Sequence, residues 1–539
     1  MSQPVSPNKV STKAAGIVGL AVMCSRVLGL VREQVFAGLF GGGRAMDAFT
    51  VAFRTPNLLR DMFAEGALST AFVTTFTKKI STEGEESAWK LASKVATLTV
   101  VFLSIITVLG IAIAPWLVKF FAPGFDAEKA ALTVLLARIM YPFILLVSLA
   151  ALAMGMLNAK NVFGVPAMAS SFFNIGSILG GVGVGYWLDP KFGPKALIGL
   201  AIGTLIGGAM QFLVQVPSLR KAGFHYRPDF KWNDSGVKTI LALMGPAIVA
   251  ASSVQVNVMI NTMFASNLGD GPIFWLQIAF RLMQLPLGLF GVALGTVTLP
   301  VLARSIAEDK PIEFRQNLAK GLRLAFLLTI PSMLGLMVLA EPIISVLYQH
   351  GRFDAHQTAQ AALALKFYAV GLVAYSAMKV LVPAFYAKDL RKTPMYVSFV
   401  AIGVNLGLNW LFTFHLGLGH RGLALSTGCV ALINFAILYF LMHRKTGRLE
   451  TRSLVVLLLK LAIPCALLVG ICWAGLHWPM AQWATQHIAP KAMWLGLTIG
   501  AAATAFFGSA LLFRIDEIDD VVGVFRRKIG PKLGLGPKV

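Results

Sequence analysis

The chain has 539 residues, of which 57% are apolar and only 13% are Asp, Glu, Lys or Arg. A soluble domain contains roughly 25% charged residues, and the mean hydropathy of this chain is +0.73. The polar residues therefore cannot cover the surface of a water-soluble particle of this size. All four cysteines, Cys24, Cys429, Cys465 and Cys472, lie in apolar stretches, which excludes a secreted disulfide scaffold. The composition predicts an all-α polytopic membrane protein.

Runs with few or no charges, each long enough to cross a bilayer, follow one another along most of the chain. A transmembrane helix needs about 17–25 residues, and Gly, Pro and clusters of charge separate the runs. Together they predict about 14 transmembrane helices. In chain order these cover residues 14–40, 46–77, 91–118, 131–157, 163–187, 196–218, 239–266, 273–303, 320–348, 358–387, 393–414, 422–442, 453–475 and 492–513.

The distribution of Lys and Arg predicts the orientation of these helices. Of the 47 Lys and Arg residues, 29 lie in one alternate set of connections, eight in the opposite set and ten within the helices. Because positively charged loops stay in the cytoplasm, both the polar segment 1–13 and the basic tail 514–539 are expected there, and no cleavable signal peptide is expected. The net charge of +23 then reflects topology and attraction to anionic membrane lipids, and no nucleic-acid partner is predicted.

An internal repeat recurs at an offset of 227 or 228 residues. The matches are AFR at 52–54 and 279–281, Pro115 and Pro342, Phe125-Asp126 and Phe353-Asp354, Tyr141 and Tyr368, Ala159-Lys160 and Ala387-Lys388, and Pro166 and Pro394. Because this offset spans six helices, an even number, both copies have the same topology. The repeat predicts two six-helix lobes, residues 14–220 and 238–442, related by a pseudo-twofold axis along the membrane normal, with two further helices in residues 453–513.

Five arginines interrupt apolar helices: Arg26, Arg32, Arg54, Arg60 and Arg281. An arginine at the bilayer centre costs about 2.5–3.5 kcal/mol even on a lenient insertion scale, so these side chains are not expected to face lipid. Two alternatives remain for them. They either pair with acids inside the protein or line a water-filled cavity between the lobes.

Four acids share the first two helices with these arginines, namely Glu33, Asp47, Asp61 and Glu65. Arg54, Asp61 and Glu65 fall at i, i+7 and i+11, close to one helical face, so pairing can neutralise part of the charge. It does not easily neutralise all of it, because the helix 273–303 that carries Arg281 contains no acid. We therefore favour a net cationic cavity for an anionic ligand. Guanidinium groups suit phosphate or diphosphate because they form bidentate hydrogen bonds.

Neither a catalytic site, a metal site nor a cofactor is predicted. The sequence contains no Gly-Lys dipeptide, so it lacks a Walker A phosphate loop, and its eight histidines show no paired metal spacing. The membrane potential acting on charges in the cavity is the natural energy source, at about 2.3 kcal/mol per elementary charge per 100 mV. Gly29, Pro56 and Pro286, which lie near the arginines, permit either helix bending or close helix packing.

Two strings, SRVLGLVRE at 25–33 and DAFTVAFRTPNLLRDMFAEGALSTAFV at 47–73, resemble the MurJ/MviN family of bacterial lipid II flippases. APGF at 122–125, GVALGTVTLP at 291–300 and VLVPAFYAKDLRKTP at 380–394 extend this resemblance. It implies the multidrug/oligosaccharidyl-lipid/polysaccharide exporter fold, in which two six-helix lobes rock around a central cavity. It implies a role in peptidoglycan biosynthesis at the bacterial inner membrane, with the cell-wall synthesis machinery as a candidate partner. The implied substrate is lipid II, the undecaprenyl-diphosphate-linked disaccharide-pentapeptide.

The resemblance also implies roles for individual residues. The family's functional cations match Arg26, Arg32, Arg60 and Arg281, and its polar positions in the second helix match Asp47, Asn57 and Glu65. Residues 453–513 are assigned to a groove for the polyprenyl tail. The chain departs from the family pattern at Arg54, where relatives can have lysine, and at Gln284, where relatives have an acid. Gln284 cannot form the ion pair of the family pattern, but it can hydrogen-bond Arg281.

Three alternatives to a lipid II flippase stay open. A flippase for another polyprenyl-diphosphate-linked glycan needs the same cationic cavity, because the charge recognises the diphosphate and not the glycan. A multidrug exporter of the same superfamily would have acids in its cavity without an excess of cations. A non-transporting membrane scaffold would need no cations within its helices. The sequence therefore favours a flippase that works by alternating access.

Overall fold

The computed structural model describes residues 12–61, 68–447, 449–478, 480 and 487–518, and every regular element in these residues is a helix. Helices are expected because a chain that crosses lipid must satisfy all its backbone hydrogen bonds internally. The contacts divide the chain into two compact units. Unit 1 runs to Ile273 and takes in His350–Phe353, and unit 2 contains Phe274–Gln349 and the residues from Asp354 onward.

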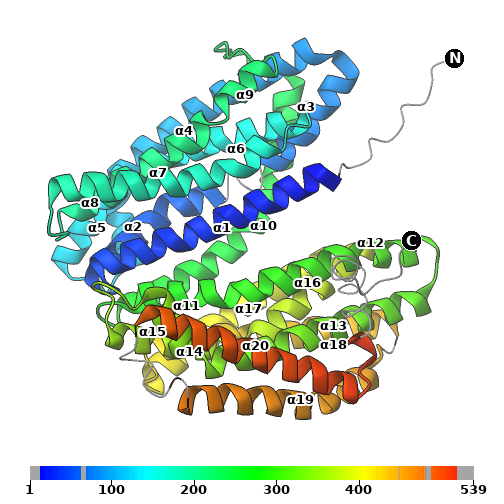
Figure 1. Cartoon of the computed structure of the whole chain (residues 1–539). Coiled ribbons are helices and arrows are strands. Elements are labelled where there is room, and N and C mark those ends of the chain that lie inside the picture. Colours follow the sequence, from blue (N-terminus) through cyan, green and yellow to red (C-terminus); the bar gives the residue numbers. More distant parts are fainter. Residues whose placement is uncertain (1–11, 62–67, 448, 479, 481–486, 519–539) are drawn as a thin grey trace. The chain divides into compact units, whose positions relative to one another are not determined.

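Unit 1 contains ten helices among the described residues (Figure 1). They are α1 (Thr12–Phe40), α2 (Arg44–Arg60), α3 (Ser69–Glu83), α4 (Glu85–Phe121), α5 (Ala127–Met140), α6 (Phe143–Ala159), α7 (Gly164–Leu188), α8 (Ala196–Leu213), α9 (Val216–Lys221) and α10 (Ser235–Ser266). The repeat places α10 in the second lobe, whereas the contacts pack α10 on α3 and α4 of unit 1.

Unit 2 begins within α11 (Pro272–Pro286) and contains the remaining elements of the described chain. They are the π-helical segment η2 (Leu287–Val292), α12 (Ala293–Ala307), α13 (Pro311–Val338), α14 (Ala340–Tyr348), α15 (Ala355–Ala369), α16 (Leu372–Ala387), α17 (Lys392–Trp410), the π-helical segment η3 (Leu411–His415), α18 (His420–Thr446), α19 (Thr451–His477) and α20 (Ile488–Leu512).

In its described residues, each of the fourteen expected ranges falls on one helix or on a consecutive series of helices. Ten stretches of the described chain have the length and hydropathy of a membrane span, and the pair α15 and α16, bent by 42°, raises this number to 11. Helices α1, α2, α3, α10 and α14 are outside this set, and α2 has only 17 residues. The chain is therefore a multi-pass helical membrane protein, and the count of fourteen spans stays a prediction.

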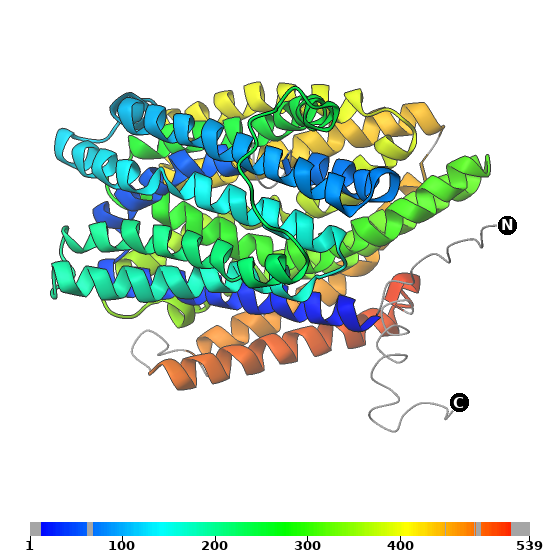
Figure 2. The same cartoon turned by 90° about the horizontal axis from the view of Figure 1, so that it is seen from above.

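Glycines bring α7 and α8 of unit 1 into direct backbone contact. The two helices lie side by side in both cartoon views (Figures 1 and 2). A Cβ atom on Gly199 would lie 2.3 Å from the backbone nitrogen of Gly185, and one on Gly203 would lie 2.3 Å from that of Gly181. Small residues at four-residue spacing are typical of close helix packing in membranes. This contact fixes α7, on which α1 in turn packs.

The two copies of the repeat have the same local structure around the matched aspartates. Asp126 caps the N-terminus of α5 by accepting a hydrogen bond from the Lys129 backbone N–H, and Asp354 caps α15 by accepting one from Gln357. In both copies the helix then breaks, after Met140 in unit 1 and after Ala369 in unit 2. The capping aspartate satisfies a backbone donor that would otherwise lack a partner at the helix start.

A polar cluster ties the ends of unit 2 helices together beside an apolar surface. The Arg323 guanidinium donates to the Glu517 carboxylate, to the Glu450 carboxylate at 3.2 Å and to the Ser453 hydroxyl at 2.8 Å.

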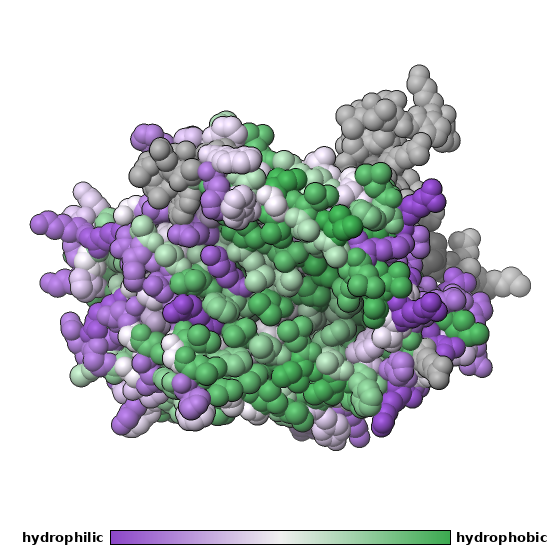
Figure 3. Space-filling model, turned by 90° about the horizontal axis from the view of Figure 1, so that it is seen from below, coloured by the Kyte–Doolittle hydropathy of each residue, from purple (hydrophilic) through white to green (hydrophobic). Residues whose placement is uncertain are grey.

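Farther along α19, Leu459 is 70% exposed. The face drawn in Figure 3 has apolar side chains across its middle and polar side chains toward its two ends. This pattern is the one expected of a surface that meets lipid.

Candidate functional site

Helix α1 presents two of the predicted arginines in unit 1. Arg26 is exposed, whereas Arg32 is half-buried and its guanidinium carbon lies 5.0 Å from the centre of the Phe173 ring on α7. Glu33, which follows Arg32, is only 4% exposed. The Asn174 side chain of α7 donates to the Ser25 carbonyl at 3.1 Å. Packing on α7 therefore fixes the rotation of α1 and with it the directions of these charged side chains.

The second helix connects its arginines to α10. The Arg54 guanidinium donates to the Thr262 hydroxyl, and Arg54 is half-buried. This hydroxyl also donates to the Val258 carbonyl within α10, at 2.7 Å. A neutral hydroxyl orients Arg54 without removing its positive charge.

Asp61 collects several hydrogen bonds just beyond the end of α2. Its carboxylate accepts from Arg60 at 2.8 and 3.2 Å, from the Asn57 side chain at 3.5 Å and from the Gln255 side chain of α10 at 3.0 Å. The side chains of Arg60 and Asp61 are 21% and 27% exposed. Internal pairing thus accounts for part of the charge, and Asp61 pairs with Arg60 rather than along the predicted face with Arg54.

Among the predicted site residues that the structure describes in unit 1, the arginines outnumber the acids. Beside Arg26, Arg32, Arg54 and Arg60, the described residues include three of the predicted acids, namely Glu33, Asp61 and Asp47. The third acid, Asp47, is fully buried and accepts hydrogen bonds from Lys129 and from the Gly271 backbone. Glu65, the fourth predicted acid, lies outside the described residues. An excess of positive charge therefore remains among the site residues that the structure describes.

Arg281 and Gln284 lie on α11 in unit 2, directly before a helix irregularity. Arg281 is half-buried and Gln284 is exposed. After Pro286 the helix continues as the π-helical segment η2 and then as α12. A Cβ atom on Gly295 would lie 2.4 Å from the Lys379 carbonyl oxygen, so close packing uses this glycine. The π-helical segment η2 directly follows Pro286, for which the sequence allowed either helix bending or close helix packing. Such π-helical turns are common at functional sites.

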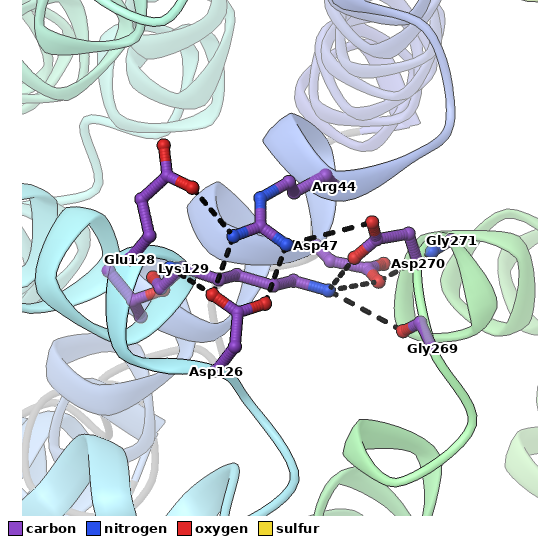
Figure 4. Close-up of polar contacts among 9 residues, drawn as sticks. Arg44, Asp47, Asp126, Glu128, Lys129, Gly269, Asp270 and Gly271 are labelled. Atoms are coloured by element: carbon purple, nitrogen blue, oxygen red, sulfur yellow. Dashed lines mark hydrogen bonds and ion pairs between the residues drawn. The ribbon is translucent and has the colours of Figure 1, made fainter.

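Sequence reasoning missed an ionic network in unit 1 that is centred on the buried residues Asp47 and Lys129 (Figure 4). The eight Lys and Arg residues that the sequence assigns to the opposite set of connections include Lys129, but this residue lies on α5 and is only 2% exposed. Its ammonium group contacts Asp47 at 3.1 Å and Asp270 at 2.8 Å. Arg44 contacts Asp126 at 2.6 Å beside this pair. Because these partners are 82 or more residues apart along the chain, no local sequence pattern connects them.

The Arg44–Asp126 contact predicts a pH dependence of stability. Hydrogen bonds from Arg44, and then from the Lys129 backbone, hold the pKa of Asp126 well below its ordinary value of 3.8. A lowered folded-state pKa adds stability that is complete above the unfolded-state value and is lost as the pH falls through the folded-state value. We expect Asp126→Asn to cause a small fall in Tm at pH 6, and this difference should shrink below pH 3.8.

Asp354→Asn is the matched control for this prediction, because Asp354 caps α15 through a backbone N–H and asparagine is also a good N-cap. Both variants should be compared by thermal unfolding from pH 6 downward. Equal effects of the two substitutions at every pH would contradict a contribution from the Arg44 pair.

Comparison with known families gives a match over most of the chain. The family model described as lipid II flippase MurJ matches residues 36–493. A Vibrio cholerae protein named probable lipid II flippase MurJ is 35% identical over 523 residues, which cover 95% of this chain and 98% of the relative. A Burkholderia cenocepacia protein named lipid II flippase MurJ is 39% identical over 431 residues, which cover 79% of this chain and 82% of the relative.

Solved structures agree with these matches. A lipid II flippase MurJ in an inward closed conformation aligns with a TM-score of 0.76 at 27% identity, over 93% of this chain and 99% of that chain. An inward-facing multidrug resistance transporter of the MATE family in the MOP superfamily aligns with a TM-score of 0.62 over 81% of this chain and 95% of that chain. At 14% identity, the second likeness shows the fold alone.

Proposed function

Because the chain belongs to the lipid II flippase MurJ family, we propose that it moves lipid II from the cytoplasmic to the periplasmic leaflet of a bacterial inner membrane. The protein acts as a transporter and not as an enzyme, with both termini in the cytoplasm. The headgroup enters a cationic cavity open to the cytoplasm while the polyprenyl tail stays in lipid. A change from inward-facing to outward-facing states then exposes the headgroup on the other side.

The excess of arginine charge on α1 and α2 carries this proposal. A diphosphate has the charge and the oxygen geometry that guanidinium groups recognise. At about 4 Å and an effective dielectric near 20, one such pair contributes roughly 4 kcal/mol before desolvation. Arg54 is one of these arginines, and its guanidinium donates a hydrogen bond to the hydroxyl of Thr262. A multidrug exporter for cationic drugs does not fit a site with this sign of charge.

Separate roles follow for the site residues. Arg26, Arg32, Arg54, Arg60 and Arg281 bind the diphosphate or restore the empty site after release. Glu33, Asp47, Asn57, Asp61, Glu65 and Gln284 form the polar contacts that change between states. The Asn57 side-chain oxygen is buried and accepts no hydrogen bond within the described structure. It is therefore suited to accept one from a hydroxyl or amide group of the substrate.

The predicted lobes give these roles a frame. Residues 14–220 and 238–442 form the two lobes that alternate, and residues 453–513 form the groove for the polyprenyl tail. The apolar exposed surface of α19 supports this last assignment. Segments 1–13 and 514–539 stay in the cytoplasm, where the basic tail meets anionic lipid. Bending at η2 moves α11, with Arg281, relative to α12. The membrane potential acts on the charges in the cavity.

Conditional depletion of the protein in its native bacterium tests the proposal. The measurement is lipid II accessible from outside the inner membrane, compared with total lipid II. Accumulation of total lipid II with loss of the external pool is the expected result. An unchanged external pool would contradict the proposal, and direct binding of other polyprenyl-diphosphate glycans by the purified protein would then identify the alternative substrate.

A further inference from the structure

The connection between α10 and α11 is the place where the main chain leaves unit 1. Residues 267–271 link the two helices, and the first stretch of unit 1 ends at Ile273. Gly269 and Gly271 have φ angles of 87° and 108°, in a region that L side chains rarely adopt. This link therefore has a definite turned shape that two glycines make possible.

Buried charges hold this link against unit 1. The Asp47 carboxylate on α2 accepts a hydrogen bond of 2.7 Å from the Gly271 backbone N–H. The Lys129 ammonium group on α5 donates to the Asp270 carboxylate at 2.8 Å and to the Gly269 carbonyl at 3.5 Å. Asp47 and Lys129 also pair with each other at 3.1 Å (Figure 4). Three successive residues of the link thus contact two charged side chains that water hardly reaches.

The second copy of the repeat has residues at the matched positions that cannot form an ion pair. The offset of 227 or 228 residues places Phe274 opposite Asp47 and Gln357 opposite Lys129. There, α11 packs on α15 through rings, with Trp275 and His356 centred 6.0 Å apart and Phe280 and Tyr368 centred 5.3 Å apart. Aromatic contacts therefore join α11 to α15, where the first copy has the ion pair between α2 and α5. Burial of an ion pair is costly unless its groups are fully hydrogen-bonded, and the link supplies those hydrogen bonds.

We propose that Lys129 is a positioning residue for transport, which with Asp47 holds the 269–271 link on unit 1. Helix α11 starts directly after the link and runs without a break to Pro286. Arg281 lies nine residues beyond Pro272, about 14 Å along the helix axis. A held link therefore fixes the position at which α11 starts, and Arg281 lies on the same unbroken helix. This inference rests on the proposed function, because it makes the held link a requirement for movement of the substrate.

Hydrogen exchange of the full-length protein in lipid nanodiscs tests the held link, with Lys129→Met and Asp270→Ala as the variants. Asp270 is half-exposed, so its replacement should leave folding intact even if Lys129→Met does not. Lys119→Met is the matched control, because Lys119 is exposed and lies outside the network. We expect the link amides to exchange at least tenfold faster in both variants, with α7 and α8 unchanged and with the control equal to wild type.

Transport by the same variants completes the test. In depleted cells that express each variant alone, externally accessible lipid II should fall at least fivefold for Lys129→Met and Asp270→Ala and stay at the wild-type level for Lys119→Met. Unchanged link exchange in Asp270→Ala would overturn the proposal, and so would faster exchange with full transport. If Lys129→Met raises hydrogen exchange throughout the protein, that variant is not folded correctly, and the result for Asp270→Ala alone tests the proposal. Failure of wild-type protein to restore the external pool would instead overturn the proposed function, while link exchange still tests the contacts.

Discussion

Replacement of Arg26 and Arg281 together by alanine is expected to abolish the external lipid II pool in depleted cells while the protein still inserts and folds. Arg26 is exposed in unit 1 and Arg281 is half-buried in unit 2. A hydrogen bond to a charged group contributes about 1.5–3 kcal/mol, so each lost arginine should weaken diphosphate binding by roughly tenfold to a hundredfold. Two losses together should reduce transport to the background of the depleted strain.

The controls for this prediction separate charge, geometry and folding. Arg138→Ala should keep full transport, because Arg138 is exposed near a helix end and donates to the Ile111 carbonyl at 3.2 Å. Replacement of Arg26 and Arg281 by lysine should restore part of the transport, since lysine keeps the charge but lacks the bidentate fork. Membrane level and thermal stability are measured for each variant. Full transport by the double alanine variant would rule out the assigned role of these arginines.

Helix positions were predictable because lipid imposes a strong pattern on sequence. The described part of every expected range falls on one helix or on successive helices, and the repeat includes the two aspartates that cap α5 and α15. The breaks within the ranges were harder to predict. The range 131–157 divides at Tyr141 and Pro142, although Pro142 is a local signal that could have indicated it. The π-helical segment after Pro286 depends on tertiary packing and has no comparable signal in composition.

The candidate site was predictable in its residue types but not in its pairing. Arginines in apolar helices are conspicuous because their cost in lipid is high. Helical spacing suggested that Asp61 shares a face with Arg54, but the carboxylate pairs with Arg60, the adjacent residue, where α2 ends. The burial of Lys129 was not predictable, because Lys129 is the third residue of α5, close to a loop, and its partner Asp270 is 141 residues away. Contacts between distant charges depend on the fold and not on local spacing.

Gly203→Val is expected to remove most of the folded protein from the membrane. An added Cβ would lie 2.3 and 2.5 Å from the backbone nitrogen and Cα of Gly181, and 2.8 Å from the Ser177 carbonyl oxygen. All three are backbone atoms, so no side chain can rotate away to make room. Overpacking of this kind belongs to the small class of substitutions that cost about 4 kcal/mol or more, and it should separate α8 from α7.

Gly183→Val provides the matched control, because Gly183 is exposed on α7 and a Cβ there meets nothing within 4 Å. Both variants add the same side chain to a helical glycine, so they share the small change in helix propensity. Thermal unfolding in detergent and the yield of monodisperse protein are the measurements. Comparable stability of the two variants would contradict direct backbone packing of α7 on α8. A loss of stability in Gly203→Val alone would instead show that van der Waals contact between the backbones of α7 and α8 stabilises unit 1. Such contact is important in membranes because no hydrophobic driving force acts between helices in lipid.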